Sequence, residues 1–374
     1  MNILNGDESG GHGGDLVRAA RQWLPEGGTL LDFSSNINPL GPPPGLIDYL
    51  REALPEITAY PTPQARELRE AMAAHLKVPP GSLMLGNGAN ELIHLLMLWL
   101  KPARVFVGAP TFSEYERAAR LAGCPVEKFS LLPGEDFIPS SLGERLKDGD
   151  LLVFCNPNNP TGKLYSREDI LTLAGEAEAR GACLLVDESF LPLTGTGKME
   201  NSISSSLGHN AWVALSLTKI WGLPGLRLGC LIGPPDGIGF LTRWGDPWRV
   251  NTLAQKAGQY CLGQDTYLDD SLALIAEERS FLETALEKGG IFKVYPGAAN
   301  YLLLESRSKS FEVASFQEKL ASKGILIRRA DNFALLDHRH FRIAVKRRAE
   351  NLRLLNEINR LMEIEKVIDP GMDA

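Results

Sequence analysis

The sequence lacks the features that would tie it to a disulfide framework, a metal ion or a membrane. Its five cysteines form no C-x-x-C pair and no cluster with histidine, so we expect buried, reduced thiols in a cytoplasmic protein and no metal site. No apolar run reaches the roughly 18 residues that a membrane-spanning helix needs. The start, "MNILNGDESGGHGGDL", has neither a basic segment nor an apolar one, and it predicts no secretory signal.

An excess of positive charge is also missing. The formal net charge is −7, which argues against nucleic acid as a partner. It leaves anionic small substrates open, because a few arginines can outweigh the global sign locally. The apolar fraction of 44% and the charged fraction of 23% are those of an ordinary globular protein. With 374 residues, the chain is long enough for one large domain or two smaller ones.

The middle of the chain alternates short apolar runs with amphipathic stretches. This pattern is typical of an α/β fold with a mainly parallel sheet that helices cover on both faces. After about residue 265 the pattern changes to a long helix and a compact α+β unit. We expect strands at 82–88, 104–110, 150–157, 182–189, 212–217, 227–233, 299–306, 325–330 and 340–345, and helices at 89–100, 112–123, 166–181, 266–289 and 311–324, with one more helix at the C-terminus.

The proline cluster "PLGPPPG" at 39–45 suggests a boundary near the N-terminus. We therefore expect an N-terminal arm at 1–44 that belongs to a small domain, a large domain at 45–265, and the rest of the small domain at 266–374.

Polar residues follow several of the predicted strands, where ligands bind in open α/β sheets. They lie in "GNGAN" (86–90), "PTFSEY" (110–115), "NPNNPTG" (156–162), "DES" (187–189) and "SLTKIWGLPGLRLG" (216–229). Taken singly, each has an ordinary explanation. Asp187 could cap a helix, Lys219 could be a solvated surface charge, and Arg227 could be a salt-bridge partner.

Together these residues match one cofactor, pyridoxal phosphate. A lysine can form a Schiff base with its aldehyde, and an aspartate can keep its ring nitrogen protonated, because an opposite charge favours the cationic form. A helix N-terminus, two hydroxyls and an arginine can hold its phosphate. An asparagine can hydrogen-bond its phenolate oxygen, and an aromatic side chain can stack on its ring.

The motifs and their order resemble those of the fold-type I pyridoxal-phosphate enzymes in the class I/II aminotransferase superfamily, across essentially the whole chain. The resemblance implies the PLP-dependent transferase-like fold and a catalytic pair, Lys219 and Asp187, with Lys219 joined to the cofactor and shuttling protons. It implies that Asp187 pairs with the ring nitrogen, Asn159 binds the phenolate oxygen, and Phe112 stacks on the ring in place of the more usual tyrosine. The cofactor phosphate would be held by Gly88, Ala89, Asn90, Ser216, Thr218 and Arg227, and by Tyr60 of a neighbouring subunit, which implies a homodimer with shared sites.

Within the superfamily the chain resembles two groups most, the threonine-phosphate decarboxylases of cobalamin biosynthesis and the histidinol-phosphate aminotransferases. The segments "GHGGDL" (11–16), "SSNINPLG" (34–41) and "ILIRRADNF" (325–333) favour the decarboxylases, although "GHGG" could be a flexible arm and "IRRA" a strand edge with two solvated arginines. The implied activity is decarboxylation of L-threonine O-3-phosphate to (R)-1-amino-2-propanol O-2-phosphate. The alternatives are amino transfer from histidinol phosphate to 2-oxoglutarate, or a regulatory domain that binds the cofactor without turnover. The expected substrate-binding residues are His12, Asn38, Asn159, Asn300, Arg328 and Arg342, with Arg329 as a further candidate.

Overall fold

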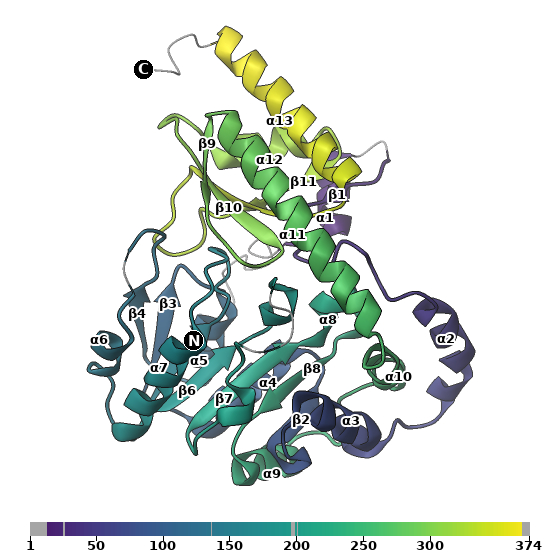
Figure 1. The fold of residues 1–374 in the computed structure, drawn as a ribbon, viewed down its shortest axis with the longest axis vertical. Coiled ribbons are helices and arrows are strands. Elements are labelled where there is room, and N and C mark those ends of the chain that lie inside the picture. Colours follow the sequence, from purple (N-terminus) through teal and green to yellow (C-terminus); the bar gives the residue numbers. More distant parts are fainter. Residues whose placement is uncertain (1–12, 25–26, 136, 196–198, 200, 369–374) are drawn as a thin grey trace. The chain divides into compact units, whose positions relative to one another are not determined.

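The computed structural model describes residues 13–24, 27–135, 137–195, 199 and 201–368. Their contacts divide the chain into two compact units (Figure 1). The large unit comprises residues 37–276 and 298–300, and the small unit comprises residues 1–36, 277–297 and 301–374. The domain limits predicted from the sequence stay a prediction. They lie eight and eleven residues from these divisions. The second division falls within one continuous helix, α11 (Asp265–Lys288), which belongs to both units.

A seven-stranded sheet forms the centre of the large unit. Its order is β2-β8-β7-β6-β5-β3-β4, and every neighbouring pair is parallel except the two that involve β8. The predicted α/β fold with a mainly parallel sheet is confirmed. The strands are β2 (Leu83–Gly86), β3 (Arg104–Ala109), β4 (Val126–Ser130), β5 (Asp150–Cys155), β6 (Cys183–Asp187), β7 (Ala211–Ser216) and β8 (Gly229–Ile232).

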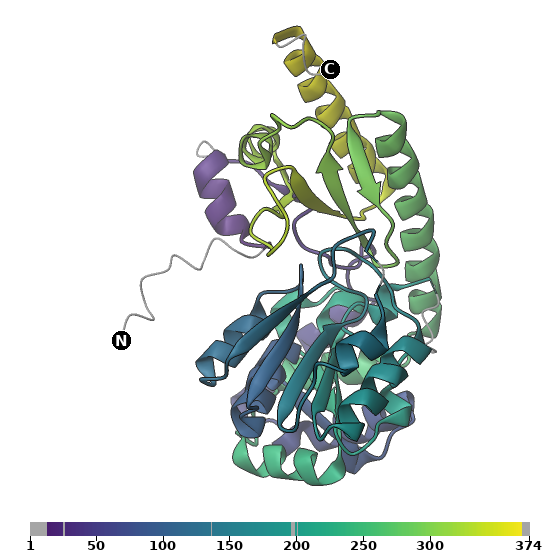
Figure 2. The same ribbon diagram turned by 90° about the vertical axis from the view of Figure 1, so that its left-hand side faces the viewer.

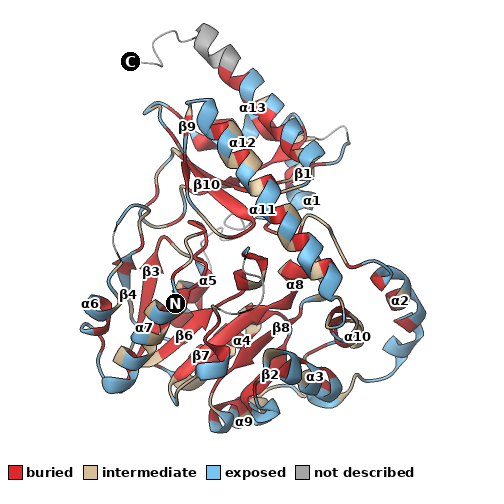
Figure 3. Cartoon of the chain, in the orientation of Figure 1, coloured by how far each residue is buried: buried red, intermediate tan, exposed pale blue. Residues whose placement is uncertain are grey.

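Helices cover both faces of this sheet (Figure 2). The central strands are therefore buried on both sides, which explains why β5 and β7 are almost continuously apolar (Figure 3). Helix α4 (Ala89–Leu100) begins and ends at the predicted residues. The other helices are α2 (Leu46–Ala53), α3 (Arg66–Leu76), α5 (Glu114–Leu121), α6 (Pro139–Gly143), α7 (Arg167–Ala179), α8 (Leu217–Ile220), α9 (Pro235–Trp244) and α10 (Thr252–Cys261).

The small unit is built on an antiparallel sheet of order β12-β13-β10-β9 and a separate parallel pair, β1 and β11. Its core includes Phe292, Phe316 and Phe341, all nearly inaccessible to solvent. The expected strand at 325–330 is divided in two, because β11 pairs with β1 whereas β12 pairs with β13. The elements are α1 (Leu16–Trp23), β1 (Leu31–Asp32), β9 (Phe292–Tyr295), β10 (Tyr301–Ser306), α12 (Val313–Ala321), β11 (Ile325–Leu326), β12 (Arg328–Arg329), β13 (His340–Ala344) and α13 (Arg348–Ile368).

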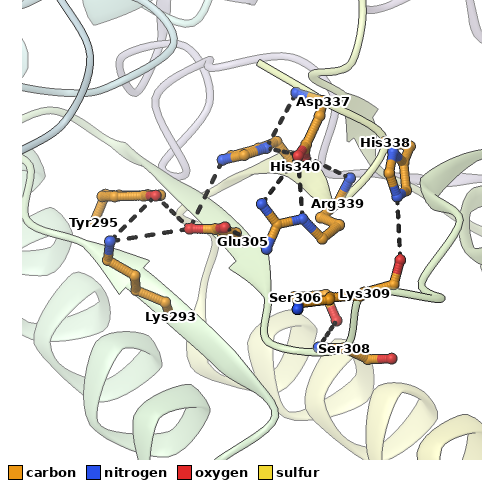
Figure 4. Close-up of polar contacts among 10 residues, drawn as sticks. All are labelled: Lys293, Tyr295, Glu305, Ser306, Ser308, Lys309, Asp337, His338, Arg339 and His340. Carbon is orange, nitrogen blue, oxygen red and sulfur yellow. Dashed lines mark hydrogen bonds and ion pairs between the residues drawn. The ribbon is translucent and has the colours of Figure 1, made fainter. Parts of the chain in front are cut away.

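A polar network links β9, β10 and the start of β13 (Figure 4). The Tyr295 hydroxyl donates to Glu305, which also pairs with Arg339 at 2.7 Å. Arg339 and His340 both bind Asp337, and hydrogen bonds from Arg339 help to hold the pKa of that carboxyl near 2 against the effect of its burial. The network fixes the loop before β13 to the sheet.

No helix in the described part of the chain has the length and apolar character to cross a membrane.

Candidate active site

Four of the motifs singled out in the sequence lie at the ends of neighbouring parallel strands, β3, β5, β6 and β7, and the fifth, "GNGAN", follows the edge strand β2. Cys155 at the end of β5 is paired in register with Asp187 at the end of β6, and Asp187 is paired with Ala214 in β7. Because the carboxyl ends of parallel strands meet at one edge, the loops after these strands start side by side.

Asp187 is held by two hydrogen bonds within the large unit. Its Oδ2 accepts from the Tyr115 hydroxyl at 2.6 Å, and its Oδ1 accepts from the Ser189 backbone N–H at 2.9 Å. Asp187 is 6% exposed and Tyr115 is 1% exposed. Burial raises the pKa of Tyr115 well above its ordinary value, and the charge of Asp187 acts in the same direction, so the phenol stays a donor.

The Cys155 thiol lies among the groups that surround Asp187. Burial raises the pKa of this thiol to about 12, and the charge of Asp187 adds to the effect. The charge of Lys219 and a hydrogen bond from the Asn159 backbone act in the opposite direction. Asp187, Asn159 and Lys219 are therefore gathered around one buried thiol.

Lys219 lies in α8, the single helical turn that follows β7. Its neighbours Thr218 and Ile220 are buried, and its Nζ lies 4.8 Å from the centre of the Phe190 ring. An amine must lose its proton before it can attack an aldehyde.

The residues predicted to bind the cofactor phosphate cluster at the start of α4. Gly88 has a φ of 88°, and a Cβ at this position would lie 2.4 Å from an Nη of Arg227. Only glycine allows the backbone and the guanidinium to come so close. In the same way, a Cβ on Gly229 would lie 2.3 Å from the Ala89 nitrogen.

The hydroxyls of the β7–α8 turn lie next to this cluster. Ser216 is the β-sheet partner of Gly229, and its Oγ lies 3.0 Å from the Oγ1 of Thr218. The side chain of Asn90 donates to Glu114 at 3.1 Å. The first N–H groups of a helix lack intrahelical acceptors, so the twelve-residue helix α4, two hydroxyls and an arginine form a cradle for a dianion.

Phe112 lies in the loop after β3. Its ring packs edge-on against Tyr115, with centroids 5.5 Å apart and an interplanar angle of 82°. Asn159, in the loop after β5, is buried.

Of four further predicted site residues, one is exposed, two are buried, and one lies outside the described part of the chain. Tyr60 is 82% exposed, and its ring lies 4.8 Å from that of Trp248. Asn300 is fully buried, and neither polar atom of its side chain has a hydrogen-bond partner in the structure. His12 lies outside the described residues.

Asn38 is the fourth, and its side chain is engaged within the large unit. Its Nδ2 donates to the Ile220 carbonyl at 2.7 Å and to the Ser271 hydroxyl at 2.8 Å. Its Oδ1 accepts from the Leu40 N–H at 3.0 Å.

The small unit contains two buried arginines in register. Arg328 in β12 is the direct antiparallel partner of Arg342 in β13, and they are 8% and 6% exposed. Arg328 donates to Asn332 at 2.9 Å and Arg342 to the Ser34 carbonyl at 2.8 Å. Burial lowers the pKa of Arg328 to about 9, with the charge of Arg342 adding to the effect, and burial lowers the pKa of Arg342 to about 10.

Arg329, the further candidate, forms a partly exposed pair with Asp331. Two like charges opposite each other in a sheet are unfavourable, so the pair of Arg328 and Arg342 suits an anionic ligand.

Three residues near Asp187 and Lys219 escaped the sequence reasoning, namely Tyr115, Cys155 and Phe190. Tyr115 follows Phe112 by three residues, and this helical spacing was a usable signal. The contacts of Cys155 and Phe190 depend on strand pairing and on the path of α8, which no local pattern reveals.

Comparisons with known proteins identify the family of the chain. Residues 28–358 match the family described as aminotransferase class I and II. The chain belongs to this family. Its cofactor is pyridoxal 5′-phosphate, as for the family. The cradle at Gly88, the carboxylate of Asp187 and the lysine of α8 fit the phosphate, the ring nitrogen and the aldehyde of this group.

Individual relatives of the chain are similar over most of their length. A threonine-phosphate decarboxylase of Salmonella typhimurium is 35% identical over 94% of this chain and 96% of that protein. A histidinol-phosphate aminotransferase of Desulfitobacterium hafniense is 34% identical over 88% of this chain and 91% of that protein. The crystal structure of the histidinol-phosphate aminotransferase from Clostridium acetobutylicum has a TM-score of 0.82 at 28% identity, covering 89% of this chain and 99% of that one.

Proposed function

We propose that the chain decarboxylates L-threonine O-3-phosphate to (R)-1-amino-2-propanol O-2-phosphate and CO2, a reaction of cobalamin biosynthesis. The observation that carries this proposal is the presence of the segments "GHGGDL" and "SSNINPLG", together with similarity to a threonine-phosphate decarboxylase. The buried pair of Arg328 and Arg342 fits the anionic groups of the substrate. The substrate has a carboxylate and a phosphate, and each guanidinium can bind one of them through two parallel hydrogen bonds.

In this proposal the large unit holds the cofactor. Asp187 binds the ring nitrogen, Asn159 the phenolate oxygen, and Phe112 the face of the ring. The cradle of Gly88, Ala89, Asn90, Ser216, Thr218 and Arg227 binds the phosphate. When bound, pyridoxal phosphate supplies an electron sink for the electron pair that CO2 leaves behind.

Lys219 has two roles in the proposed reaction. Its Nζ would hold the cofactor through the aldehyde, and it would supply the proton that takes the place of CO2 at Cα. Lys219 is half-buried in the structure.

The orientation in which the substrate is held would decide which bond at Cα breaks. A phosphate held away from Cα can set this orientation, so that binding energy is used for positioning. We propose that Arg328 and His12 bind the phosphate, with Asn38 and Arg329 as further candidates, and that Arg342 and Asn300 bind the carboxylate. A tight bond from Arg342 would stabilise the carboxylate and oppose the loss of CO2, so we expect this contact to be strained.

The second candidate function is amino transfer from histidinol phosphate to 2-oxoglutarate. Similarity to a histidinol-phosphate aminotransferase favours it. The arginine pair fits this reaction too, because 2-oxoglutarate has two carboxylates and histidinol phosphate has a phosphate. The two reactions would share the cofactor site. They differ in the substrate, in the bond that is cleaved at Cα and in the need for a second substrate, because only amino transfer requires an acceptor for the amino group.

One experiment separates the two functions. The purified protein, loaded with pyridoxal phosphate, is incubated with L-threonine O-3-phosphate or with histidinol phosphate, each with and without 2-oxoglutarate. The decarboxylase releases CO2 from threonine phosphate at a rate that does not depend on 2-oxoglutarate. Formation of glutamate from histidinol phosphate and 2-oxoglutarate, with no CO2 released from threonine phosphate, would instead establish the aminotransferase.

We also propose that the chain works as a homodimer with shared sites. Support comes from Tyr60, which is exposed beside Trp248 together with the apolar side chains of Leu54 and Ile57. In the dimer Tyr60 would bind the phosphate of the cofactor in the neighbouring subunit. Beyond this second copy, the expected partner is a phosphorylated amino-acid substrate, and the net charge of −7 gives no reason to add nucleic acid.

A further inference from the structure

Tyr115 is a buried polar side chain to which no role has been given so far. It lies in the first turn of α5, and its hydroxyl donates to Asp187 Oδ2 at 2.6 Å. The Ser189 N–H donates to the other oxygen, Oδ1, at 2.9 Å. Each oxygen of a carboxylate can accept two hydrogen bonds. Asp187 is therefore fixed in direction by the protein and can still accept from a ligand.

The hydroxyl of Tyr115 stays a hydrogen-bond donor to Asp187. Burial raises the pKa of Tyr115 well above the ordinary value, so the phenol keeps its proton. The Tyr115 hydroxyl thus orients the buried carboxylate.

The ring of Tyr115 has a separate contact. It packs at nearly a right angle to the ring of Phe112, the residue proposed to stack on the cofactor. One side chain therefore contacts two proposed binding residues, the carboxylate through its hydroxyl and the aromatic platform through its ring. Replacing Tyr115 by phenylalanine removes the first contact and keeps the second.

We propose that Tyr115 is a positioning residue for the cofactor, which acts through Asp187 to keep the ring nitrogen protonated. This inference rests on the proposed assignment of Asp187 to that nitrogen. It does not depend on which reaction the enzyme catalyses, because cofactor binding precedes the choice of substrate.

The test is a double-mutant cycle on the dissociation constant of pyridoxal phosphate, measured by titrating the apo-protein. We expect Tyr115→Phe to weaken binding about tenfold or more, from the loss of a hydrogen bond to a charged group. In an Asp187→Asn background the same substitution should change binding less than about twofold, because the group through which it acts is absent. The resonance of a 15N-labelled ring nitrogen should move toward the unprotonated value in Tyr115→Phe.

Tyr295→Phe is the matched control. Tyr295 also donates to a carboxylate, that of Glu305, but in the small unit and outside the proposed site (Figure 4). It should leave both the dissociation constant and the nitrogen resonance unchanged. The melting temperature of each apo-protein shows whether the variant is folded. We expect both variants to fold, because phenylalanine keeps the aromatic ring of the tyrosine that it replaces.

Two results would overturn the inference in distinguishable ways. If Asp187→Asn binds the cofactor as tightly as the unmodified protein, the assignment of Asp187 is wrong and the inference falls with it. If Asp187→Asn weakens binding strongly while Tyr115→Phe does not, or if Tyr115→Phe has the same effect in both backgrounds, the inference alone is wrong.

Discussion

Glu188, the residue after Asp187, shows how the environment of one side chain sets a pH dependence. It is 1% exposed, and it accepts hydrogen bonds from the Ser202 hydroxyl at 2.5 Å and the Ile203 N–H at 3.0 Å. Burial raises the pKa of Glu188 to about 7, and the charge of Asp187 acts in the same direction, against the two hydrogen bonds and the charge of Arg167. The folded protein therefore binds this proton more tightly than the unfolded chain does.

The sign of the resulting prediction follows from this difference. The ordinary pKa is 4.5, so the stabilisation from the bound proton is complete below pH 4.5 and is lost as the pH rises toward 7. Relative to Glu188→Gln, which mimics the neutral acid, the apo-protein should lose about 3 kcal/mol of unfolding free energy across this window. Urea unfolding of both proteins at several pH values between 4 and 8 measures the difference. A difference that is constant over this range would contradict the prediction.

At the scale of elements, the position of Lys219 depends on a contact between the short helix α8 and the chain near Asn38. The Asn38 N–H donates to the Lys219 carbonyl at 3.0 Å, and its side chain donates to the Ile220 carbonyl and to Ser271 in α11. Asn38 therefore holds the end of α8 in place, whether or not it also binds the substrate.

We expect Asn38→Ala to lower the free energy of unfolding of the apo-protein by about 3 kcal/mol, because the three side-chain hydrogen bonds of this buried residue are lost. Ser271→Ala removes one of these bonds and should cost about 1 kcal/mol. Urea unfolding monitored by fluorescence gives both values. A raised KM for threonine phosphate with unchanged stability would instead make Asn38 a substrate ligand with no structural role.

The same scale shows where sequence reasoning succeeds and where it stops. The limits of α4 follow from its apolar spacing and the preceding Gly88, and the strands β5, β6 and β7 follow from their apolar runs. Pairing cannot be derived in this way. Ile325 and Arg328 lie in one predicted strand yet join different sheets. The strands β4 and β9 were not predicted, because their apolar and polar residues form too mixed a pattern.

The residues of the candidate site fall into the same two groups, those that a local pattern indicates and those that depend on tertiary structure. Asp187 and Lys219 were singled out because the motifs that contain them match a known chemistry. Tyr115 was not singled out, because its contact with Asp187 depends on the approach of α5 to the end of β6, which is tertiary structure. Asn38 became a candidate through its motif, but the hydrogen bonds of its side chain could not have been predicted.

At the scale of the whole molecule, the proposed sharing of sites makes activity a property of two chains. Each site would take Lys219 and Asp187 from one subunit and Tyr60 from the other. Tyr60 is 82% exposed in a single chain and is separated from Lys219 by 158 residues of sequence. A second copy gives such an exposed aromatic side chain a binding role, and the symmetry of a dimer then repeats the contact at the second site.

This arrangement predicts complementation between two inactive variants. Lys219→Ala removes the covalent attachment of the cofactor, and Tyr60→Ala weakens the hold on its phosphate, so each homodimer should have little activity at limiting pyridoxal phosphate. In an equal mixture after subunit exchange, half of the dimers are mixed, and each mixed dimer has one intact site, which gives about one quarter of the unmodified activity. The control pairs Lys219→Ala with Asp187→Asn, two changes that affect the same site from the same subunit, and should show no recovery. A size tag on one variant shows whether mixed dimers of Lys219→Ala and Tyr60→Ala form. If they form and activity still does not return, Tyr60 acts within its own chain and the sites are not shared.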